Sequence, residues 1–141
     1  MEDSGGEIVY PTVGQISDIN RRMVEGFGGL FIPPNNLLNL DALEYILDAV
    51  SSSLFGMYST LKEKAAALAY HIISRYVFND GNKRTGSHIA LEFLRANGID
   101  IFLDESIAEL TVAVAKNEAT QEELLQWLHQ HQTSQFFASS W

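Results

Sequence analysis

Residues 60–96 read TLKEKAAALAYHIISRYVFNDGNKRTGSHIALEFLRA and contain two helical patterns separated by a short polar break. Thr60 and Glu63 form a capping-box pattern, which predicts a helix from there to about Tyr76. Four of the five residues from 65 to 69 are alanines, which allow neighbouring helices to approach closely. We therefore expect this helix to lie at the centre of the core.

The chain outside this helix also shows helical spacing of its apolar residues. The other predicted helix starts are Thr12, Asp41, Asn82, Asp104 and Thr120. The Gly- and Pro-rich segment after residue 27 reads as a loop, and a short extended flap is expected near residues 30–32. No stretch alternates in the way a sheet requires. The sequence thus predicts an all-α, compact single domain of about six helices.

Composition limits the class of protein. With 141 residues, 46% of them hydrophobic, the chain predicts one globular domain. The lack of cysteine excludes a disulfide scaffold, a thiol nucleophile and a Cys-ligated zinc site. The sequence has neither an apolar run long enough to span a membrane nor a signal pattern at its start. We therefore expect a soluble, cytoplasmic protein.

Charge is unevenly distributed along the chain. The formal net charge of −9 disfavours a nucleic-acid binder, whose affinity would come largely from neutralising phosphates. Six of the nine Lys and Arg residues nevertheless lie between Lys62 and Arg95, together with only three acidic residues. A locally positive segment in an acidic protein suits a small anionic ligand, although a mixed-charge solvated helix face is the plainer interpretation.

The polar break between the two helical patterns has the composition of an anion-binding loop. Asp80, Gly81 and Asn82 favour a turn in which the glycine adopts positive φ. The open amides at the start of the next helix then face the loop, where the helix dipole attracts anions. Lys83 and Arg84 lie in that first turn, poorly placed for helix stability and well placed to share an anion. A carboxylate beside such a site suits Mg²⁺ held together with substrate phosphates.

Each of these residues also has an ordinary structural interpretation when taken singly. Phe78 would be a core residue, Asp80 a turn residue, Asn82 a helix cap, and Lys83 and Arg84 solvated surface. The combination at the start of a helix is much harder to explain by structure alone.

Residues 76–84, YVFNDGNKR, resemble the signature of the Fic/Doc family, and specifically its Doc (death-on-curing) branch. The family pattern is His-x-Phe-x-Asp/Glu-(Gly/Ala)-Asn-(Gly/Lys)-Arg, and all fixed positions but the first are matched. The similarity extends over roughly residues 10–131, including ALAYHIISRY before the motif and TGSHIALEFLRANGI after it. Residues 1–9 are then expected to be a flexible N-terminus, and residues 132–141 a C-terminal tail.

The resemblance implies a helical Fic fold and an ATP-dependent transferase that modifies a protein hydroxyl. Carried over by position, Asp80 would hold Mg²⁺ through the nucleotide phosphates. Gly81, Asn82 and Lys83 would line the phosphate site with the loop amides, and Arg84 would neutralise the phosphates.

The resemblance also bears on which group is transferred. In AMP-transferring Fic proteins a glycine stands at the position of Lys83, and a second arginine stands where this chain has Ser87. Lys83 is typical of Doc-like proteins, in which the nucleotide is reversed and delivers its γ-phosphate. Phosphoryl transfer is therefore favoured over AMP transfer (AMPylation).

The resemblance further implies partners. Doc-like toxins phosphorylate a translation elongation factor and are silenced by a small antitoxin, whose C-terminal segment folds as a helix in a groove of the toxin. We expect such a segment to fit a groove with an apolar floor and an acidic rim. Neither nucleic acid nor a membrane is expected as a partner.

Tyr76 departs from the family pattern. The family has at this position a histidine that takes the proton from the target hydroxyl, whereas a tyrosine phenol, with an ordinary pKa near 10, donates at neutral pH. We expect the Tyr76 ring to occupy the mouth of the site. His71 is expected to be a packed helix residue, His88 to edge the pocket, and His129 and His131 to face solvent.

Three functions of different classes remain open at this point. The first is an active Doc-type toxin kinase, impaired by Tyr76. The second is a catalytically silent Fic-fold protein that binds a nucleotide or an antitoxin. The third is a structural helical interaction domain, which leaves the composition of residues 80–84 unexplained.

Overall fold

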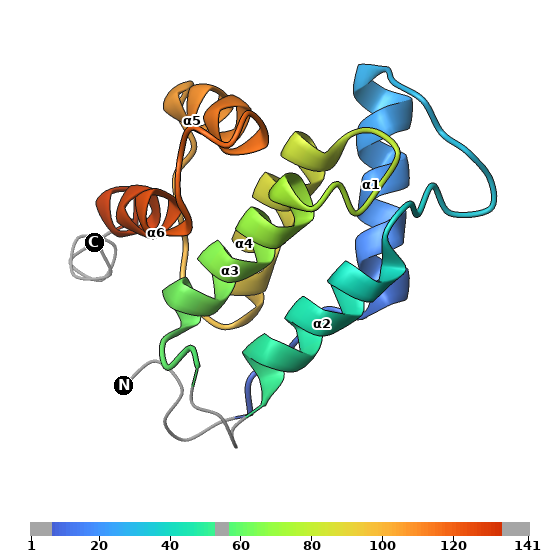
Figure 1. Cartoon of the computed structure of the whole chain (residues 1–141). Helices are drawn as coiled ribbons and strands as arrows, with labels where there is room; N and C mark the ends of the chain where they lie inside the picture. Colours follow the sequence, from blue (N-terminus) through green and yellow to red (C-terminus); the bar gives the residue numbers. More distant parts are fainter. Residues whose placement is uncertain (1–6, 53–56, 134–141) are drawn as a thin grey trace.

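A computed structural model describes residues 7–52 and 57–133, which form six α-helices. Their bounds are α1 Val13–Phe27, α2 Leu40–Ser51, α3 Leu61–Ser74, α4 Asn82–Ala96, α5 Ser106–Ala115 and α6 Gln121–Gln130. Helices α3 and α4 lie side by side in the middle, with α1 and α2 on one side and α5 and α6 on the other (Figure 1). The predicted all-α fold of about six helices is confirmed. No helix in this part of the chain has the length and apolar character needed to cross a membrane.

Local sequence signals define most of the helix ends. The predicted capping boxes at Thr12, Thr60 and Thr120 are all present, each with the side chain at N3 bonded back to the cap backbone. Two predicted starts are wrong, one by two residues and the other by one. Asn39, not Asp41, caps α2, and α5 begins at Ser106 after Glu105 rather than at Asp104. In both cases a neighbouring residue takes the cap position, which the i, i+4 apolar spacing does not distinguish.

The core is built around α3, as the alanine-rich stretch predicts. Ala65, Ala66 and Ala67 are buried, as are Leu68 and Ala69. Helix α4 approaches closely: a Cβ built on its Gly86 would lie 2.8 Å from the Ile73 side chain of α3. The small residues thus let the two central helices pack backbone to backbone, which holds the α3–α4 connection in place.

The connection from α1 to α2 is a loop in which residues 30–32 form no strand. The Leu30 and Ile32 N–H groups donate to the side chains of Asp80 and Asn36. We call residues 30–32, where the short flap is expected, the strap. Among the described residues, β-type pairing is limited to two isolated bridges, Leu37 with Phe78 and Ile101 with Gln132.

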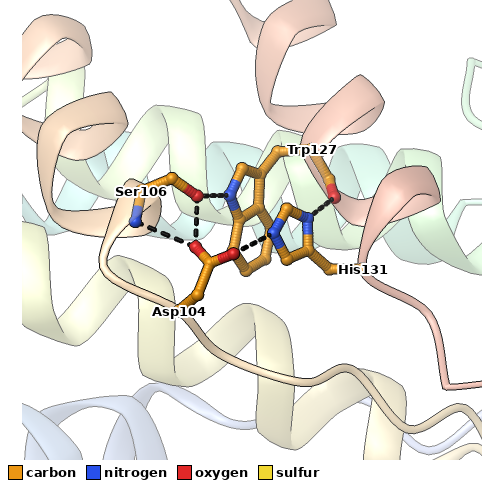
Figure 2. Close-up of polar contacts among 4 residues, drawn as sticks. All are labelled: Asp104, Ser106, Trp127 and His131. Atoms are coloured by element: carbon orange, nitrogen blue, oxygen red, sulfur yellow. Dashed lines mark hydrogen bonds and ion pairs between the residues drawn. The ribbon is translucent and has the colours of Figure 1, made fainter.

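A polar cluster joins the start of α5 to the end of α6 (Figure 2). The His131 ring stacks on Trp127 at 3.8 Å, and its Nε2 lies 2.9 Å from Asp104 Oδ2. Its Nδ1 lies 2.8 Å from the Trp127 carbonyl oxygen, and Trp127 Nε1 donates to Ser106 Oγ. The expectation that His131 faces solvent is wrong, because the residue is buried by this stacking. His129 is exposed, as expected.

The expected terminal segments lie partly outside the described residues, which leave out 1–6 and 134–141. Near the start, the Val9 backbone N–H and carbonyl both bond to the side chain of Asn97. Near the end, the Thr133 N–H donates to the Asp100 carbonyl.

Candidate active site

The loop that joins α3 to α4, residues 75–81, is anchored on the core by its middle residues. Val77 and Phe78 are fully buried, as predicted for Phe78. The Leu38 and Asn39 N–H groups both donate to the Val77 carbonyl, at 2.8 and 3.0 Å. The α1–α2 connection therefore braces the motif loop from outside, and Figure 1 shows the two segments meeting beside α1.

The N-terminus of α4 has no cap of its own. Gly81, with φ of 77°, occupies the N-cap position in the left-handed region and supplies no side-chain hydrogen bond. The first intrahelical bond runs from the Thr85 N–H to the Gly81 carbonyl. In the part of the chain that the structure describes, the N–H groups of Asn82, Lys83 and Arg84 have no acceptor. Three adjacent amides are therefore open at the positive end of the helix dipole, an arrangement that favours an anion.

Asp80 presents an ionised carboxylate next to these amides. Its Oδ2 accepts the Leu30 N–H at 2.8 Å and its Oδ1 accepts the Gly81 N–H at 2.8 Å. The hydrogen bond from Leu30, then that from Gly81, and the nearby charge of Lys83 lower the pKa of Asp80 below its ordinary value. Gly29 permits this approach, since a Cβ there would lie 2.9 Å from Asp80 Oδ2. The carboxylate is thus fixed in position while remaining exposed.

Asn82 closes the motif loop on itself. Its Oδ1 accepts the Phe78 N–H at 2.9 Å, and its Nδ2 donates to the Phe78 carbonyl at 2.8 Å. The side chain is buried by these contacts. Asn82 therefore leaves its backbone N–H open, while its side chain fixes the shape of the loop.

Lys83 and Arg84 are both exposed in the first turn of α4. That turn contains no acidic residue, so the two positive charges add to the positive end of the helix dipole. The Arg84 guanidinium lies 4.0 Å from the centroid of the Phe27 ring, which is itself exposed. The aromatic ring thus supports the arginine without neutralising its charge.

A groove of about 490 Å³ runs from these two cations along α4 and α5. Its lining comes from the end of α1, from α4, and from α5 with the residue Leu103 before it; these residues are Met23, Phe27, Lys83, Arg84, Ser87, His88, Leu91, Leu103, Ile107, Ala108, Thr111 and Val112. The floor is apolar, and the charged side chains at the edge are basic. This groove therefore lacks the acidic rim that is expected of an antitoxin groove, because its charged edge comes from the two cations of α4.

Tyr76 lies at a strained position between α3 and the motif loop. Helix α3 ends at Ser74, earlier than expected, and Tyr76 has φ of 50°, which a bulky residue rarely adopts. Its hydroxyl donates to the carbonyl of Ala115, the last residue of α5, at 3.0 Å. The structure therefore engages the phenol at the end of α5, whereas Asp80 through Arg84 are grouped at the start of α4.

The histidines near the motif do not replace the missing imidazole. His71 is packed in α3 with Nδ1 3.0 Å from the Ala67 carbonyl, as expected, and burial lowers its pKa. His88 pairs with Glu92 at 3.5 Å and borders the groove, also as expected. His129 lies 3.5 Å from Lys62 Nζ.

Local sequence patterns do not identify two buried asparagines that contact the motif loop. Asn20 of α1 donates to the Asp80 carbonyl at 2.8 Å and to Thr85 Oγ1 at 3.0 Å. Asn36 donates to Asn20 Oδ1 at 3.0 Å. The available signal is that Asn20 interrupts the apolar stripe of its helix, where it follows Ile16 by one turn and adjoins Ile19.

A comparison with known protein families agrees with this helical fold and its motif loop. The model of the Fic/DOC family matches residues 10–94, which is more than half of the chain. This range contains α1 to α4 almost entirely, together with the whole motif loop. The chain belongs to the Fic/DOC family.

A segment of the chain is also similar to a characterised member. It is 49% identical over 43 residues to the protein kinase doc of Escherichia phage P1. The matching stretch covers 30% of this chain and 34% of the phage protein, so it spans about a third of that relative.

Proposed function

We propose that this protein is a Doc-type toxin that uses ATP and Mg²⁺ to transfer a phosphoryl group to a hydroxyl of a target protein. The observation that carries the proposal is the start of α4, where three open amides, two cations and one ionised carboxylate meet. Family membership and the name of the phage relative support the same activity.

Phosphate binding follows from the electrostatics of this helix end. Open N–H groups and the helix dipole favour negative charge, and Lys83 and Arg84 add full positive charges in the same turn. Without a ligand this arrangement is unfavourable, since the cations repel the dipole and each other. A polyphosphate relieves the repulsion and satisfies the amides at once.

Asp80 has the properties that a magnesium ligand needs. Mg²⁺ in such sites is held by one or two carboxylates together with substrate phosphates. Each Asp80 oxygen accepts one backbone N–H, which leaves each with a further lone pair. The ion, when bound, would neutralise phosphate charge, and Asp80 would hold it beside the open amides.

In the reaction, the oxygen of the target hydroxyl attacks the γ-phosphorus, the bond to the β–γ bridging oxygen breaks, and ADP leaves. The hydroxyl proton leaves to a phosphate oxygen or to water. Tyr76 is poorly suited to accept it because its hydroxyl already donates to the Ala115 carbonyl. This chain's residues therefore supply positioning and charge neutralisation, on which phosphoryl transfer chiefly depends, but little general-base catalysis.

The size of Lys83 favours transfer of the γ-phosphate over transfer of AMP. A lysine stands where the AMP-transferring pattern has glycine, and Ser87, whose hydroxyl bonds to the Lys83 carbonyl, stands where that pattern has a second arginine. Incubation of the purified chain and a lysate with ATP labelled at either the γ- or the α-phosphate tests this proposal. We expect γ-label on protein and a phosphate mass increment; an adenylyl increment would refute the orientation.

Calorimetry with Mg-ATP tests the site itself. Arg84→Ala should weaken binding by about tenfold or more, as expected for a charge-assisted contact. Arg95→Ala is the matched control, because it removes an equal charge from the far end of the same helix, where Arg95 pairs with Glu92. Equal effects of the two substitutions, or no binding by the wild type, would overturn the site assignment.

One observation favours a second candidate, a silent member that binds nucleotide or antitoxin without catalysis. The Tyr76 hydroxyl donates to the Ala115 carbonyl of α5 and is therefore not free to take part in proton transfer. Binding of Mg-ATP with no label transferred from either phosphate would support this alternative.

We further propose that the groove between α1, α4 and α5 receives the helical segment of an antitoxin. Its apolar floor suits the apolar face of an amphipathic helix, and its basic edge at Lys83 and Arg84 suits acidic residues on that helix. Val112→Glu, which places charge on the floor outside the phosphate site, should weaken binding of a purified antitoxin without changing ATP affinity.

The target is proposed to be a translation factor, which mass spectrometry of labelled lysate protein would identify.

A further inference from the structure

We infer that Asn20 and Asn36 are positioning residues of the phosphate site: they hold the Asp80 carbonyl and thereby set the direction of the Asp80–Gly81 peptide. The inference rests on the proposed function, since it concerns the same site. Neither residue belongs to the motif, and they act from α1 and from the α1–α2 connection.

The Asp80 carbonyl oxygen is the point on which the buried side chains converge. Asn20 Nδ2 donates to it at 2.8 Å and Asn36 Nδ2 lies 3.5 Å from it. The second hydrogen of Asn20 Nδ2 goes to Thr85 Oγ1, and Asn20 Oδ1 accepts from Asn36. Asn20 and Thr85 are 0% exposed and Asn36 is 1% exposed, so water does not compete for these contacts.

A trans peptide carries its carbonyl and its N–H in opposite directions. Because the Asp80 carbonyl is held inward by Asn20, the N–H of Gly81 must point outward. There it meets Asp80 Oδ1, which fixes the carboxylate on the exposed side of the loop. The amides of Asn82 to Arg84 follow directly, at the start of α4. One inward hydrogen bond thus sets the direction of both the carboxylate and the open amides.

Asn36 connects the same point to the strap that contacts Asp80 from the other side. Its Oδ1 accepts the Ile32 N–H at 2.8 Å, and its backbone carbonyl accepts the Asn79 N–H at 2.9 Å. The Leu30 N–H on this strap donates to Asp80 Oδ2. Asn36 has φ of 62°, a conformation that asparagine tolerates better than most residues. The Asn36 side chain therefore links the strap to the motif loop by hydrogen bonds.

The test combines two variants that keep side-chain volume with one that removes the side chain. Asn20→Asp and Asn36→Asp remove the donated hydrogen bonds but preserve shape, and Asn36→Gly removes the side chain while tolerating the positive φ. Asn97→Ala is the matched control: Asn97 also makes three hydrogen bonds to backbone groups, those of Val9 and Phe93, but at the opposite end of α4. All variants are expected to lower the melting temperature.

Mg-ATP affinity by calorimetry and amide exchange at Leu30 and Gly81 by NMR separate positioning from stability. We expect each variant at positions 20 and 36 to weaken ATP binding by about tenfold or more and to speed exchange of both amides, while Asn97→Ala changes neither by more than about twofold. Unchanged affinity and exchange in the Asn36 variants, or an equal effect of Asn97→Ala, would overturn the inference.

The two measurements also separate this inference from the proposed function. If the wild type does not bind ATP, the proposed function fails, but exchange at Leu30 and Gly81 still decides whether the asparagines orient the loop. If Asn20→Asp does not fold, the two Asn36 variants give the answer.

Discussion

Helices α4 and α6 begin in opposite ways. The Thr120 hydroxyl at the start of α6 accepts the Glu123 N–H, and the Glu123 carboxylate accepts the Thr120 N–H. At the start of α4, Gly81 provides no side chain, and the next three amides have no acceptor among the described residues. One helix end satisfies itself, whereas the other needs an outside partner.

The charged residues at the starts of α4 and α6 show the same contrast. The first turn of α6 contains Glu122 and Glu123, which complement the positive end of its dipole. The first turn of α4 contains Lys83 and Arg84 and no acidic residue. A helix start that is capped and carries acidic residues is stabilised by its own side chains. A helix start that is uncapped and carries cations is typical of a site for an anionic ligand. The contrast between two helices of one chain therefore supports anion binding more strongly than either cation alone.

Reversing the charge at the open end should give the largest effect. Lys83→Glu with Arg84→Glu is expected to weaken Mg-ATP binding at least about 100-fold, because two charge-assisted contacts of about 1.5–3 kcal/mol each are lost. The same change should raise the stability of the unliganded protein by about 0.3–1 kcal/mol per residue, since acids complement the dipole. Calorimetry and urea unfolding measure the two quantities.

The control for this reversal is Glu122→Lys at the start of α6. It should lower stability by a similar small amount and leave ATP affinity unchanged. A double variant at α4 that lost stability and affinity together would contradict the contrast between the two ends.

Substitution of Tyr76 should change the rate of phosphoryl transfer without changing ATP affinity. Tyr76→His introduces a group with an ordinary pKa near 6.5 and is expected to raise transfer of γ-label at least about tenfold, within the usual range for general-base catalysis. Tyr76→Phe should change transfer little, because the phenol does not act as the base. ATP affinity should change by less than about 1 kcal/mol in both, since the phosphate contacts are elsewhere. A Tyr76→His variant no faster than the parent would show that the assignment is wrong.

Removing the cap of α6 should affect stability alone. Thr120→Ala breaks the capping box and is expected to reduce the free energy of unfolding by about 1 kcal/mol. Denaturant unfolding checks the loss, and calorimetry should give the parent's ATP affinity. A weakened ATP affinity in this variant would mean that the two ends are coupled.

The capping box of α3 gives the smallest effect, which depends on pH. Hydrogen bonds from the Thr60 backbone, and then from Ser59, hold the pKa of Glu63 below its ordinary value of 4.5. The ionised side chain therefore adds stability that is present above that value and is lost as the pH falls through the folded pKa. The stability difference between the wild type and Glu63→Gln should shrink on acidification. A difference independent of pH would contradict this role.

Much of the fold could be predicted because its signals are local. A capping box joins residues three apart, so Thr12, Thr60 and Thr120 could each be read from a few letters. The bounds of α4 followed in the same way from the polar turn before Asn82 and the Asn-Gly pair after Ala96.

The features that sequence analysis missed depend on contacts distant in the chain. Asn20 meets Asp80 across 60 residues, and the polar partner of the buried His131 ring is Asp104, 27 residues earlier in the chain. Helical spacing places His131 one turn after Trp127, on the buried face of α6, so this burial had a local signal that the solvent-facing expectation overlooked. The direction of the Tyr76 hydroxyl depends on where α5 ends, which no pattern around residue 76 encodes.

An NMR titration of the full chain with Mg-ATP shows whether the start of α4 differs from that of α6 as a phosphate-binding site. If the open end of α4 binds phosphate as proposed, the backbone amide signals of Asn82, Lys83 and Arg84 should shift with a common saturable curve. The amides of Gln121, Glu122 and Glu123, at the capped end of α6, should stay where they are. No shift at Asn82 to Arg84, or equal shifts at both helix ends, would contradict the account.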